Sequence, residues 1–390
     1  MTGARRLFLL SAPPLLARLK ARAARRKRLI VLVDGFGPDY LAKSEMPNLK
    51  RMAAAGSLKM GQGVIPSVTN VNNASLVTGS FPAEHGITSN FFYDPRSGKS
   101  VQMESAEFLL RPTVFERAAA AGIASALVTA KDKVRTLLSR GAAVALSAEN
   151  PPREWIERVG PRPDMYAAAA NYWALRAARQ LLRDPRFGLV YLSTTDYMMH
   201  TYAPEEAPSL EHLHTLDRLL GEIADDQPEL ELYLTADHGM NAKTEAVDLA
   251  RALAVRGVSA EAVPVIRDKH VVHHRNLGGA CYVYLRRRDE AAKAHDLLRG
   301  LAGVEEVYGN QEAARRFHLR ADRIGDLVAL GARHTAFGAL PAEREAVKIR
   351  SHGSRHEAAV PLLVYGRKVD WARYEWNLDL TRYLDWEAQA

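Results

Sequence analysis

Cysteine is almost absent from this chain of 390 residues, which contains Cys281 alone. One cysteine cannot form an internal disulfide, and a lone thiol in the apolar run 281–285 is typical of a small buried residue. No apolar run is long enough to cross a bilayer as a helix, so we expect no transmembrane segment. The cysteine usage fits a reducing compartment, and we expect a cytoplasmic protein without thiolate metal sites.

Acidic residues are missing from the first 28 residues, which carry nine Lys and Arg. The net charge of +8 therefore belongs to this stretch, and the rest of the chain is close to neutral. We expect no nucleic-acid partner, because the globular part lacks the basic excess that such a partner requires. Residues 1–27 are interpreted as a basic arm. It is either an extra helix or tail before the first strand, or an amphipathic or organellar presequence.

The rest of the sequence has the 47% apolar and 25% charged composition of a globular protein, long enough for one domain with an insertion or for two. Apolar, β-branched runs alternate with helical segments. The runs cover 28–34, 124–129, 187–192, 230–235 and 359–365. This alternation predicts an α/β fold with a doubly wound, mostly parallel central sheet. The shorter elements after residue 242 predict a smaller α+β cap over 243–345, inserted into a core of 28–242 plus 346–390.

The stretch 65–79 joins Pro66 and a Ser/Thr/Asn cluster to a helix-forming segment. Thr69 is therefore predicted at a loop-to-helix junction, where unpaired N–H groups and the helix dipole favour an anion. A hydroxyl there becomes a nucleophile if a coordinated metal lowers its pKa, and otherwise it is a helix cap. Metal ligands elsewhere in the chain decide between these roles.

Aspartate and histidine recur at the ends of the predicted strands: Asp34, Asp196 with His200, Asp237 with His238, and His352. Each alone is compatible with a helix cap or a hydrogen-bonded core residue. Their joint position at the edge where open α/β sheets bind ligands predicts a metal site. The i,i+4 spacing of Asp196 and His200 points both the same way on one helical turn. Six Asp and His ligands exceed the needs of one tetrahedral ion, so we expect two ions.

Other candidates are less distinctive. His356 competes with His352 as a ligand, and Gly353 favours His352 because it permits a close turn. Lys131 and Lys133 follow the strand 124–129 and suit a small anionic substrate or, equally, a solvated turn. Both reach a ligand only if the chain has left the strand by then. His273 and His274 lie in the predicted cap and face the cleft, solvent or an interface.

Several motifs together resemble the nucleotide pyrophosphatase/phosphodiesterase branch of the alkaline phosphatase superfamily, and within it the phosphonoacetate hydrolases. They are Val-Leu-Val-Asp34-Gly, Pro-Ser-Val-Thr69-Asn, Ala-Lys131-Asp-Lys133, Thr-Thr-Asp196-Tyr-x-x-His200, Ala-Asp237-His238-Gly, Val-Val-His-His274 and Arg-Ser-His352-Gly. The resemblance covers roughly residues 28–368 and implies an alkaline-phosphatase-like sheet. The segment 150–164 and the basic arm depart from it.

The resemblance also implies a residue assignment. One Zn²⁺ would be bound by Asp196, His200 and His352, and a second by Asp34, Asp237, His238 and the Thr69 oxygen, with Mn²⁺ or Fe²⁺ as substitutes. Thr69 would attack phosphorus and become a phosphothreonine. Asn90 would hold a phosphonate oxygen, Lys131 and Lys133 the substrate carboxylate, and His274 would also contact the substrate.

The function expected from these residues is hydrolysis of the C–P bond of phosphonoacetate, a small-molecule phosphonate. The enzyme alternative is a phosphodiesterase or phosphomonoesterase that acts on a small phosphate ester, or on another carboxylated phosphonate, with the same metals. A non-catalytic metal-binding or surface-binding module is the alternative from another class. The sequence leaves the oligomeric state open, a homodimer included.

Overall fold

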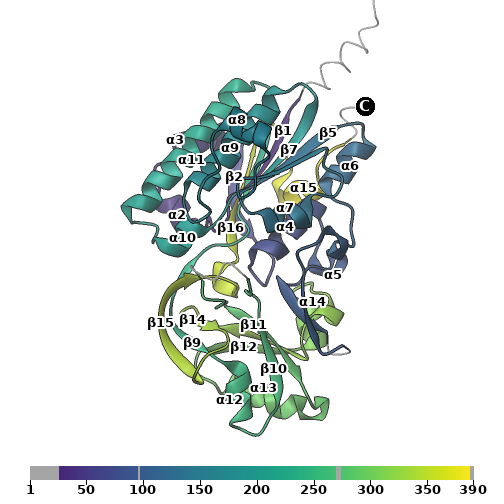
Figure 1. Cartoon of the computed structure of the whole chain (residues 1–390), viewed down its shortest axis with the longest axis vertical. Helices are drawn as coiled ribbons and strands as arrows, with labels where there is room; N and C mark the ends of the chain where they lie inside the picture. Colours follow the sequence, from purple (N-terminus) through teal and green to yellow (C-terminus); the bar gives the residue numbers. More distant parts are fainter. Residues whose placement is uncertain (1–25, 95–96, 269–273, 387–390) are drawn as a thin grey trace, which may run out of the picture.

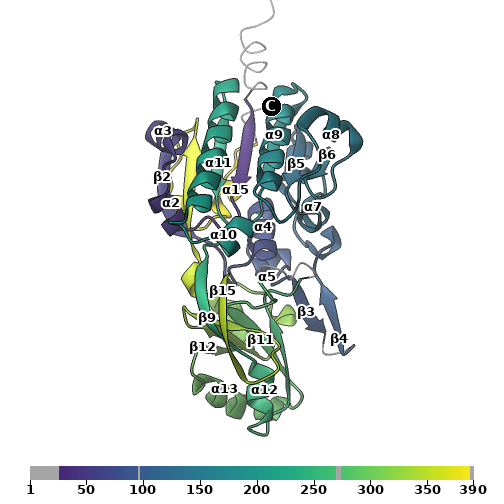
Figure 2. The same ribbon diagram turned by 60° about the vertical axis from the view of Figure 1, so that its left-hand side comes forward.

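The computed structural model describes residues 26–94, 97–268 and 274–386 (Figures 1 and 2). Its upper half is built on a seven-stranded sheet in which only β16 runs antiparallel to its neighbours. In order across the sheet the strands are β2 (Ser57–Gln62), β16 (Ala359–Tyr365), β8 (Glu231–Thr235), β1 (Arg28–Leu32), β7 (Phe187–Ser193), β5 (Ala124–Thr129) and β6 (Val144–Ser147). The predicted α/β fold with a mostly parallel central sheet is confirmed.

Helices cover both faces of this sheet, which explains why its central strands are apolar throughout rather than alternating. One face carries α2 (Pro38–Lys43), α3 (Pro47–Ala55), α8 (Arg153–Val159), α9 (Ala169–Arg183), α10 (Tyr197–Thr201) and α11 (Ala207–Asp226). The other carries α4 (Thr69–Thr78), α6 (Val114–Ala120), α7 (Asp132–Leu138) and α15 (Asp379–Arg382), with α5 (Pro82–His85) beside them. All residues of β1 and β8 are buried between these layers.

The lower half contains two smaller sheets with their own apolar cluster. One has the order β14 (Thr335–Phe337), β9 (Asn241–Val247), β15 (Arg344–Ser351). The other has the order β10 (Ala260–Pro264), β11 (Ala280–Leu285), β13 (Leu327–Gly331), β12 (Val304–Gly309). Helices α12 (Leu249–Ala254), α13 (Ala291–Arg299) and α14 (Asn310–Arg316) pack on these strands. We propose to treat this half as the inserted cap; β9 and β15, which pair with each other, lead into and out of it.

A hairpin of β3 (Phe91–Asp94) and β4 (Lys99–Gln102) projects beside the lower half, where β3 contacts β10 (Figure 2). It belongs to the sequence of the upper half and therefore brings the preceding residue, Asn90, to the boundary between the halves.

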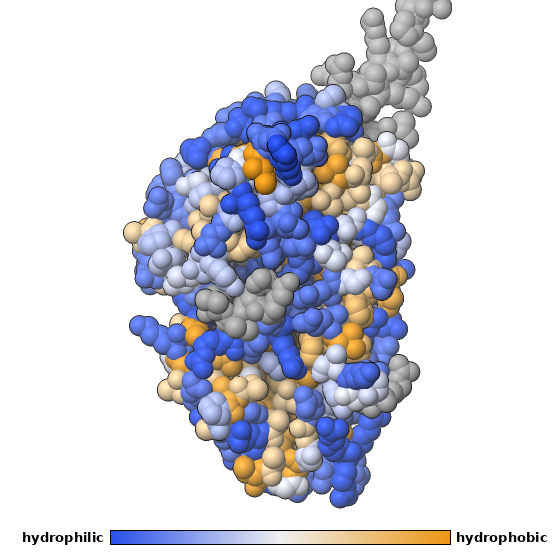
Figure 3. Space-filling model, viewed as in Figure 1, coloured by the Kyte–Doolittle hydropathy of each residue, from blue (hydrophilic) through white to orange (hydrophobic). Residues whose placement is uncertain are grey.

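No helix within the described residues is long and apolar enough to cross a membrane. On the face shown in Figure 3, hydrophilic residues predominate and hydrophobic residues are interspersed among them.

Candidate active site

Three neighbouring strands end at the same level and deliver the three aspartates. Leu32, the last residue of β1, pairs with Ser193 at the end of β7 and with Thr235 at the end of β8. Parallel strands in register release their next residues on one edge of the sheet. Asp34, Asp196 and Asp237 therefore emerge together at this edge of the sheet.

Thr69 is the first residue of α4, with Val68 as the N-cap, so it lies at the predicted loop-to-helix junction. Its hydroxyl is not the cap of this helix; Thr69 Oγ1 instead lies 3.4 Å from His238 Nε2. The helix ends at Gly79, whose left-handed φ of 62° is readily adopted only by glycine. Asn73 donates to the carbonyl oxygen of Thr69 and accepts from the Tyr191 hydroxyl, which holds this first turn against β7.

His352 is carried on a turn after β15 that is locked to the segment before Thr69. Its Nδ1 bonds to the carbonyl oxygen of Ser67 at 2.8 Å, and the Gly353 amide donates to Ser67 Oγ. Gly353 has a φ of 118°, and a Cβ there would lie 2.9 Å from the Gly279 amide nitrogen. The turn therefore requires glycine, as the sequence suggested. His356 lies apart, paired with Glu305.

The three histidines of the cluster share one tautomer. The Nδ1 atoms of His200, His238 and His352 each face a backbone carbonyl oxygen, of Arg350, Gly239 and Ser67 respectively, at 2.6–2.9 Å. A carbonyl oxygen only accepts, so Nδ1 carries a proton, and in the neutral ring Nε2 presents a lone pair. Histidine ligands of metals are commonly oriented by this kind of second hydrogen bond.

These lone pairs point at carboxylate oxygens. His200 Nε2 lies 2.9 Å and His352 Nε2 3.6 Å from Asp196 Oδ2, while His238 Nε2 lies 3.5 Å from Asp34 Oδ1 and 3.4 Å from Asp237 Oδ2. Atoms that bind one tetrahedral ion at ~2.0–2.1 Å lie roughly 3.3 Å from one another. The distances between the histidine nitrogens and the carboxylate oxygens therefore match those between ligand atoms that surround a shared cation.

Two trios bring one ligand atom from each residue within 4.8 Å of the others: Asp196–His238–His352 and Asp34–Asp237–His238. The sequence resemblance places His200 with Asp196 and His352, and places His238 with Asp34 and Asp237. In the structure His238 reaches both trios, because its ring stacks on His352 with centroids 3.5 Å apart.

Negative charge is in excess at this cluster. Asp34, Asp196 and Asp237 are at most 2% exposed, and Lys131 is the ammonium that contacts two of them. Burial, and then the charges of Asp196 and Asp237, raise the pKa of Asp34 well above its ordinary value. Burial likewise raises the pKa of Asp237 to about 6. The ammonium of Lys131 therefore does not balance the negative charge of the three carboxylates.

Divalent cations fit this set of residues. Both carboxylate oxygens of Asp34 and Oδ2 of Asp237 are buried without a hydrogen-bond partner among the described residues. A buried ionised oxygen left unsatisfied is costly, and a metal ion removes that cost. Mixed carboxylate and imidazole donors suit zinc, manganese or iron.

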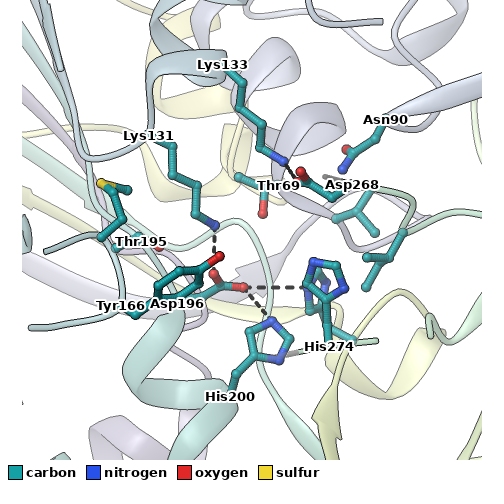
Figure 4. Close-up of a pocket in the computed structure, with 14 residues that line it drawn as sticks. Thr69, Asn90, Lys131, Lys133, Tyr166, Thr195, Asp196, His200, Asp268 and His274 are labelled. Carbon is teal, nitrogen blue, oxygen red and sulfur yellow. Dashed lines mark hydrogen bonds and ion pairs between the residues drawn. The ribbon is translucent and has the colours of Figure 1, made fainter. Parts of the chain in front are cut away.

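Beside the cluster lies a cavity with an empty volume of about 530 Å³, which includes space open to solvent. Figure 4 shows Thr69, Lys131 and Asp196 converging on it, with Asn90 and Lys133 on its far wall. Lys131 is the N-cap residue of α7 and Lys133 lies in its first turn, so the chain has left the strand and both side chains reach the cavity.

Lys131 and two of the aspartates stabilise each other's charged forms. Lys131 Nζ lies 2.8 Å from Asp196 Oδ1 and 3.5 Å from Asp34 Oδ2. Burial alone would lower the pKa of Lys131, but these two carboxylates outweigh it and keep that pKa above its ordinary value. Burial would raise the pKa of Asp196, yet Lys131 helps to hold it well below its ordinary range. Both groups are thus charged.

His274 also lines the cavity, with its ring centroid 5.8 Å from that of His200. Its Nδ1 accepts from the Asn276 amide, so in the neutral ring Nε2 carries the proton. His273, the other candidate of that pair, lies outside the described residues.

Sequence reasoning missed two parts of the cavity wall. Asp268, from the connection between β10 and β11, forms an ion pair with Lys133. Met165, Tyr166 and Ile266 form an apolar side. Neither part follows a strand of the central sheet, and no motif marked them; only the folded chain places them beside Thr69.

The fold and the site together define a hydrolase architecture of the alkaline phosphatase superfamily. Residues 28–355 match the type I phosphodiesterase / nucleotide pyrophosphatase family, and the chain belongs to that family. The resemblance inferred from the motifs is thereby confirmed.

Among solved structures, phosphonoacetate hydrolase from Sinorhizobium meliloti 1021 in complex with phosphonoformate is 34% identical, with a TM-score of 0.85 over 92% of this chain and 95% of the other. The same enzyme in complex with phosphonoacetate gives 33% and 0.83 over the same shares. Human ectonucleotide pyrophosphatase/phosphodiesterase family member 1 is 28% identical over 54% of this chain. The chain spans only 23–44% of the length of the first three curated relatives it matches.

Proposed function

We propose that this chain is a two-metal hydrolase that cleaves phosphonoacetate to acetate and phosphate, with Thr69 as the nucleophile. The observation that carries the proposal is the shared cavity. It places the Thr69 hydroxyl and the ammonium groups of Lys131 and Lys133 around one space. Asp196, His200 and His352 of the Asp/His cluster line the same space. Similarity to phosphonoacetate hydrolase over nearly the whole of both chains supports the choice of substrate.

The proposed reaction displaces carbon from phosphorus. Thr69 Oγ1 forms a bond to phosphorus as the C–P bond breaks, and the electron pair passes to the methylene carbon. Such a carbanion is accessible only if its charge spreads into the neighbouring carboxylate as an enediolate. Protonation of the carbon gives acetate, and water then hydrolyses the phosphothreonine to phosphate and free Thr69.

The residues of the cavity supply what this step needs. An ammonium beside the substrate carboxylate stabilises charge where it develops, which is the role proposed for Lys131. Asn90 lines the cavity with a buried Oδ1 that has no hydrogen-bond partner among the described residues, and its amide is placed to hold a phosphonate oxygen. His274 also lines the cavity and would contact the substrate.

Asp196, His200 and His352 would hold one zinc ion, and Asp34, Asp237, His238 and Thr69 the other. When bound, two such ions acidify the nucleophile and offset the charge of the phosphonate. Lys131 remains an ammonium beside this cluster, and the carbonyl-fixed tautomers keep each Nε2 of the three histidines aimed at it.

A second candidate is hydrolysis of a phosphodiester by the same Thr69. The apolar side of the cavity favours it, because Met165, Tyr166 and Ile266 offer contact area to a leaving group larger than acetate. Tyr166 is steadied there by an edge contact with Tyr197, with ring centroids 5.8 Å apart.

The test is the release of phosphate and acetate from phosphonoacetate by zinc-loaded protein, beside a bis(nitrophenyl) phosphate and methylphosphonate. The proposal expects equal amounts of acetate and phosphate, and no release from methylphosphonate, whose carbanion has no carboxylate to receive the charge. Faster turnover of the diester with no acetate would establish the second candidate instead.

A further inference from the structure

An ion pair crosses the cavity between the two halves of the molecule. Lys133 comes from α7 of the upper half, and Asp268 from the connection after β10 in the lower half; their side chains bond through Nζ and Oδ2 (Figure 4). Both side chains are only 5% exposed, and both line the cavity beside Thr69. The pair therefore lies within the ligand-binding space.

The position of Asp268 is fixed from two sides. Its backbone amide donates to Asn276 Oδ1 at 2.8 Å, which braces this end of the connection between β10 and β11. The neighbouring guanidinium of Arg267 lies over the Phe91 ring, 4.2 Å from its centroid. Arg267 thus packs on the hairpin strand β3, while Asp268 faces Lys133.

The two lysines of the cavity are thereby engaged by different carboxylates. Lys131 contacts Asp196 and Asp34, which belong to the proposed metal cluster, whereas Lys133 contacts Asp268, which does not. Asp268 belongs to neither of the two Asp/His trios. A ligand that brings its own carboxylate to Lys133 must therefore compete with Asp268 for the same ammonium.

We propose that Asp268 is a specificity-determining residue: an internal carboxylate that competes for Lys133 and so sets how strongly the cavity prefers carboxylated over uncarboxylated ligands. The identity of the ligand as a carboxylated phosphonate rests on the proposed function; the competition at Lys133 rests on the ion pair. Removal of Asp268 alone leaves an uncompensated ammonium that attracts a ligand carboxylate. Removal of Lys133 alone leaves an uncompensated carboxylate that repels it.

The experiment measures binding by calorimetry with zinc-loaded full-length protein, so that no turnover is needed. The probes are phosphonoformate, which carries a carboxylate, and methylphosphonate, which does not. The proteins are the wild type, Asp268→Asn, Lys133→Met and the double variant. Asp322→Asn is the matched control: it removes one carboxylate of the lower half, paired with Arg320 and 65% exposed. Asp268→Ser runs in parallel, so that misfolding of one substitution does not decide the result.

Because hydrogen bonds between charged groups are stronger than those between neutral groups, Asp268→Asn should tighten the binding of phosphonoformate about tenfold or more. The affinity for methylphosphonate, which has no carboxylate to compete for Lys133, should change by less than about twofold. Lys133→Met should weaken phosphonoformate, and the added Asp268→Asn should restore part of the loss.

Equal effects of Asp268→Asn on both probes, weaker binding of phosphonoformate, or no recovery in the double variant would overturn the proposal. A wild-type protein that binds phosphonoformate yet releases no acetate from phosphonoacetate refutes the proposed function alone. The two failures are therefore distinguishable.

Discussion

Replacement of Lys131 by methionine separates stabilisation of the leaving group from the chemistry at phosphorus. Methionine keeps the length of the side chain and removes the charge. Removing one preorganised donor to a developing anion lowers kcat about 10²–10³-fold in other enzymes, or roughly 3–4 kcal/mol. We expect a loss of that size in kcat/KM for phosphonoacetate. A nitrophenyl diester expels a stable anion, so its loss should stay within about tenfold.

The contacts of Lys131 define the controls for this variant. Its ammonium lies 2.8 Å from Asp196 Oδ1 and 3.5 Å from Asp34 Oδ2, so its removal takes positive charge away from the proposed metal ligands. We therefore expect the metal content, measured by plasma mass spectrometry, to be retained. Lys133→Met removes an ammonium from the same cavity and is the matched comparison. Equal losses on phosphonoacetate and on the diester, at full metal content, would refute the assignment of Lys131 to the leaving group.

Three further predictions concern the nucleophile, the metals and a buried histidine. Thr69→Ala should lower kcat at least about 10³-fold on either substrate class while Thr69→Ser retains a measurable rate, because the hydroxyl is the attacking group; an active alanine variant contradicts this. Chelation should lower the melting temperature, and zinc at about 100 times its dissociation constant should restore about 2.7 kcal/mol of stability, read by calorimetry; no shift with zinc would argue against a metal site. His85 is fully buried, bonded to Ser75 and to the Ile87 amide, and burial lowers its pKa to about 3 from an ordinary value of about 6.5. The contribution of neutral His85 to the free energy of unfolding is therefore complete above about pH 6.5. It is lost as the pH falls towards 3, at up to about 1.4 kcal/mol per pH unit. Between about pH 7 and pH 5, the free energy of unfolding measured with urea should fall by about 2 kcal/mol less for His85→Asn than for the wild type. The control variant, with the exposed His334→Asn, should follow the wild type. Parallel pH curves for His85→Asn and the wild type would refute this prediction.

Much of the fold was readable from the sequence because its central strands are buried on both faces and therefore continuously apolar. The runs at 28–34, 187–192 and 230–235 became β1, β7 and β8, and their shared register brought Asp34, Asp196 and Asp237 to one edge. Thr69 was placed at a helix start by local chemistry alone. The sequence thus predicted those site residues whose positions follow from the end of a strand or of a helix.

The residues that sequence reasoning missed are positioned by tertiary packing. Asp268 is one of them: it lies 135 positions from the predicted Lys133 and meets it only because the lower half folds over the sheet edge. Tyr166 faces the cavity from a segment with no regular secondary structure of its own. Residues 1–25 of the basic arm lie outside the described residues, and the cytoplasmic location and a homodimer stay predictions.

The central claim is that Thr69 attacks the phosphorus of phosphonoacetate. The most direct measurement is mass spectrometry of zinc-loaded protein, acid-quenched during turnover of phosphonoacetate and digested with protease. The account predicts a phosphoryl group on the peptide that contains Thr69, formed together with acetate and absent from Thr69→Ala. Acetate and phosphate released in equal amounts by the wild type, with undiminished release by Thr69→Ala, would contradict it and assign the attack to water.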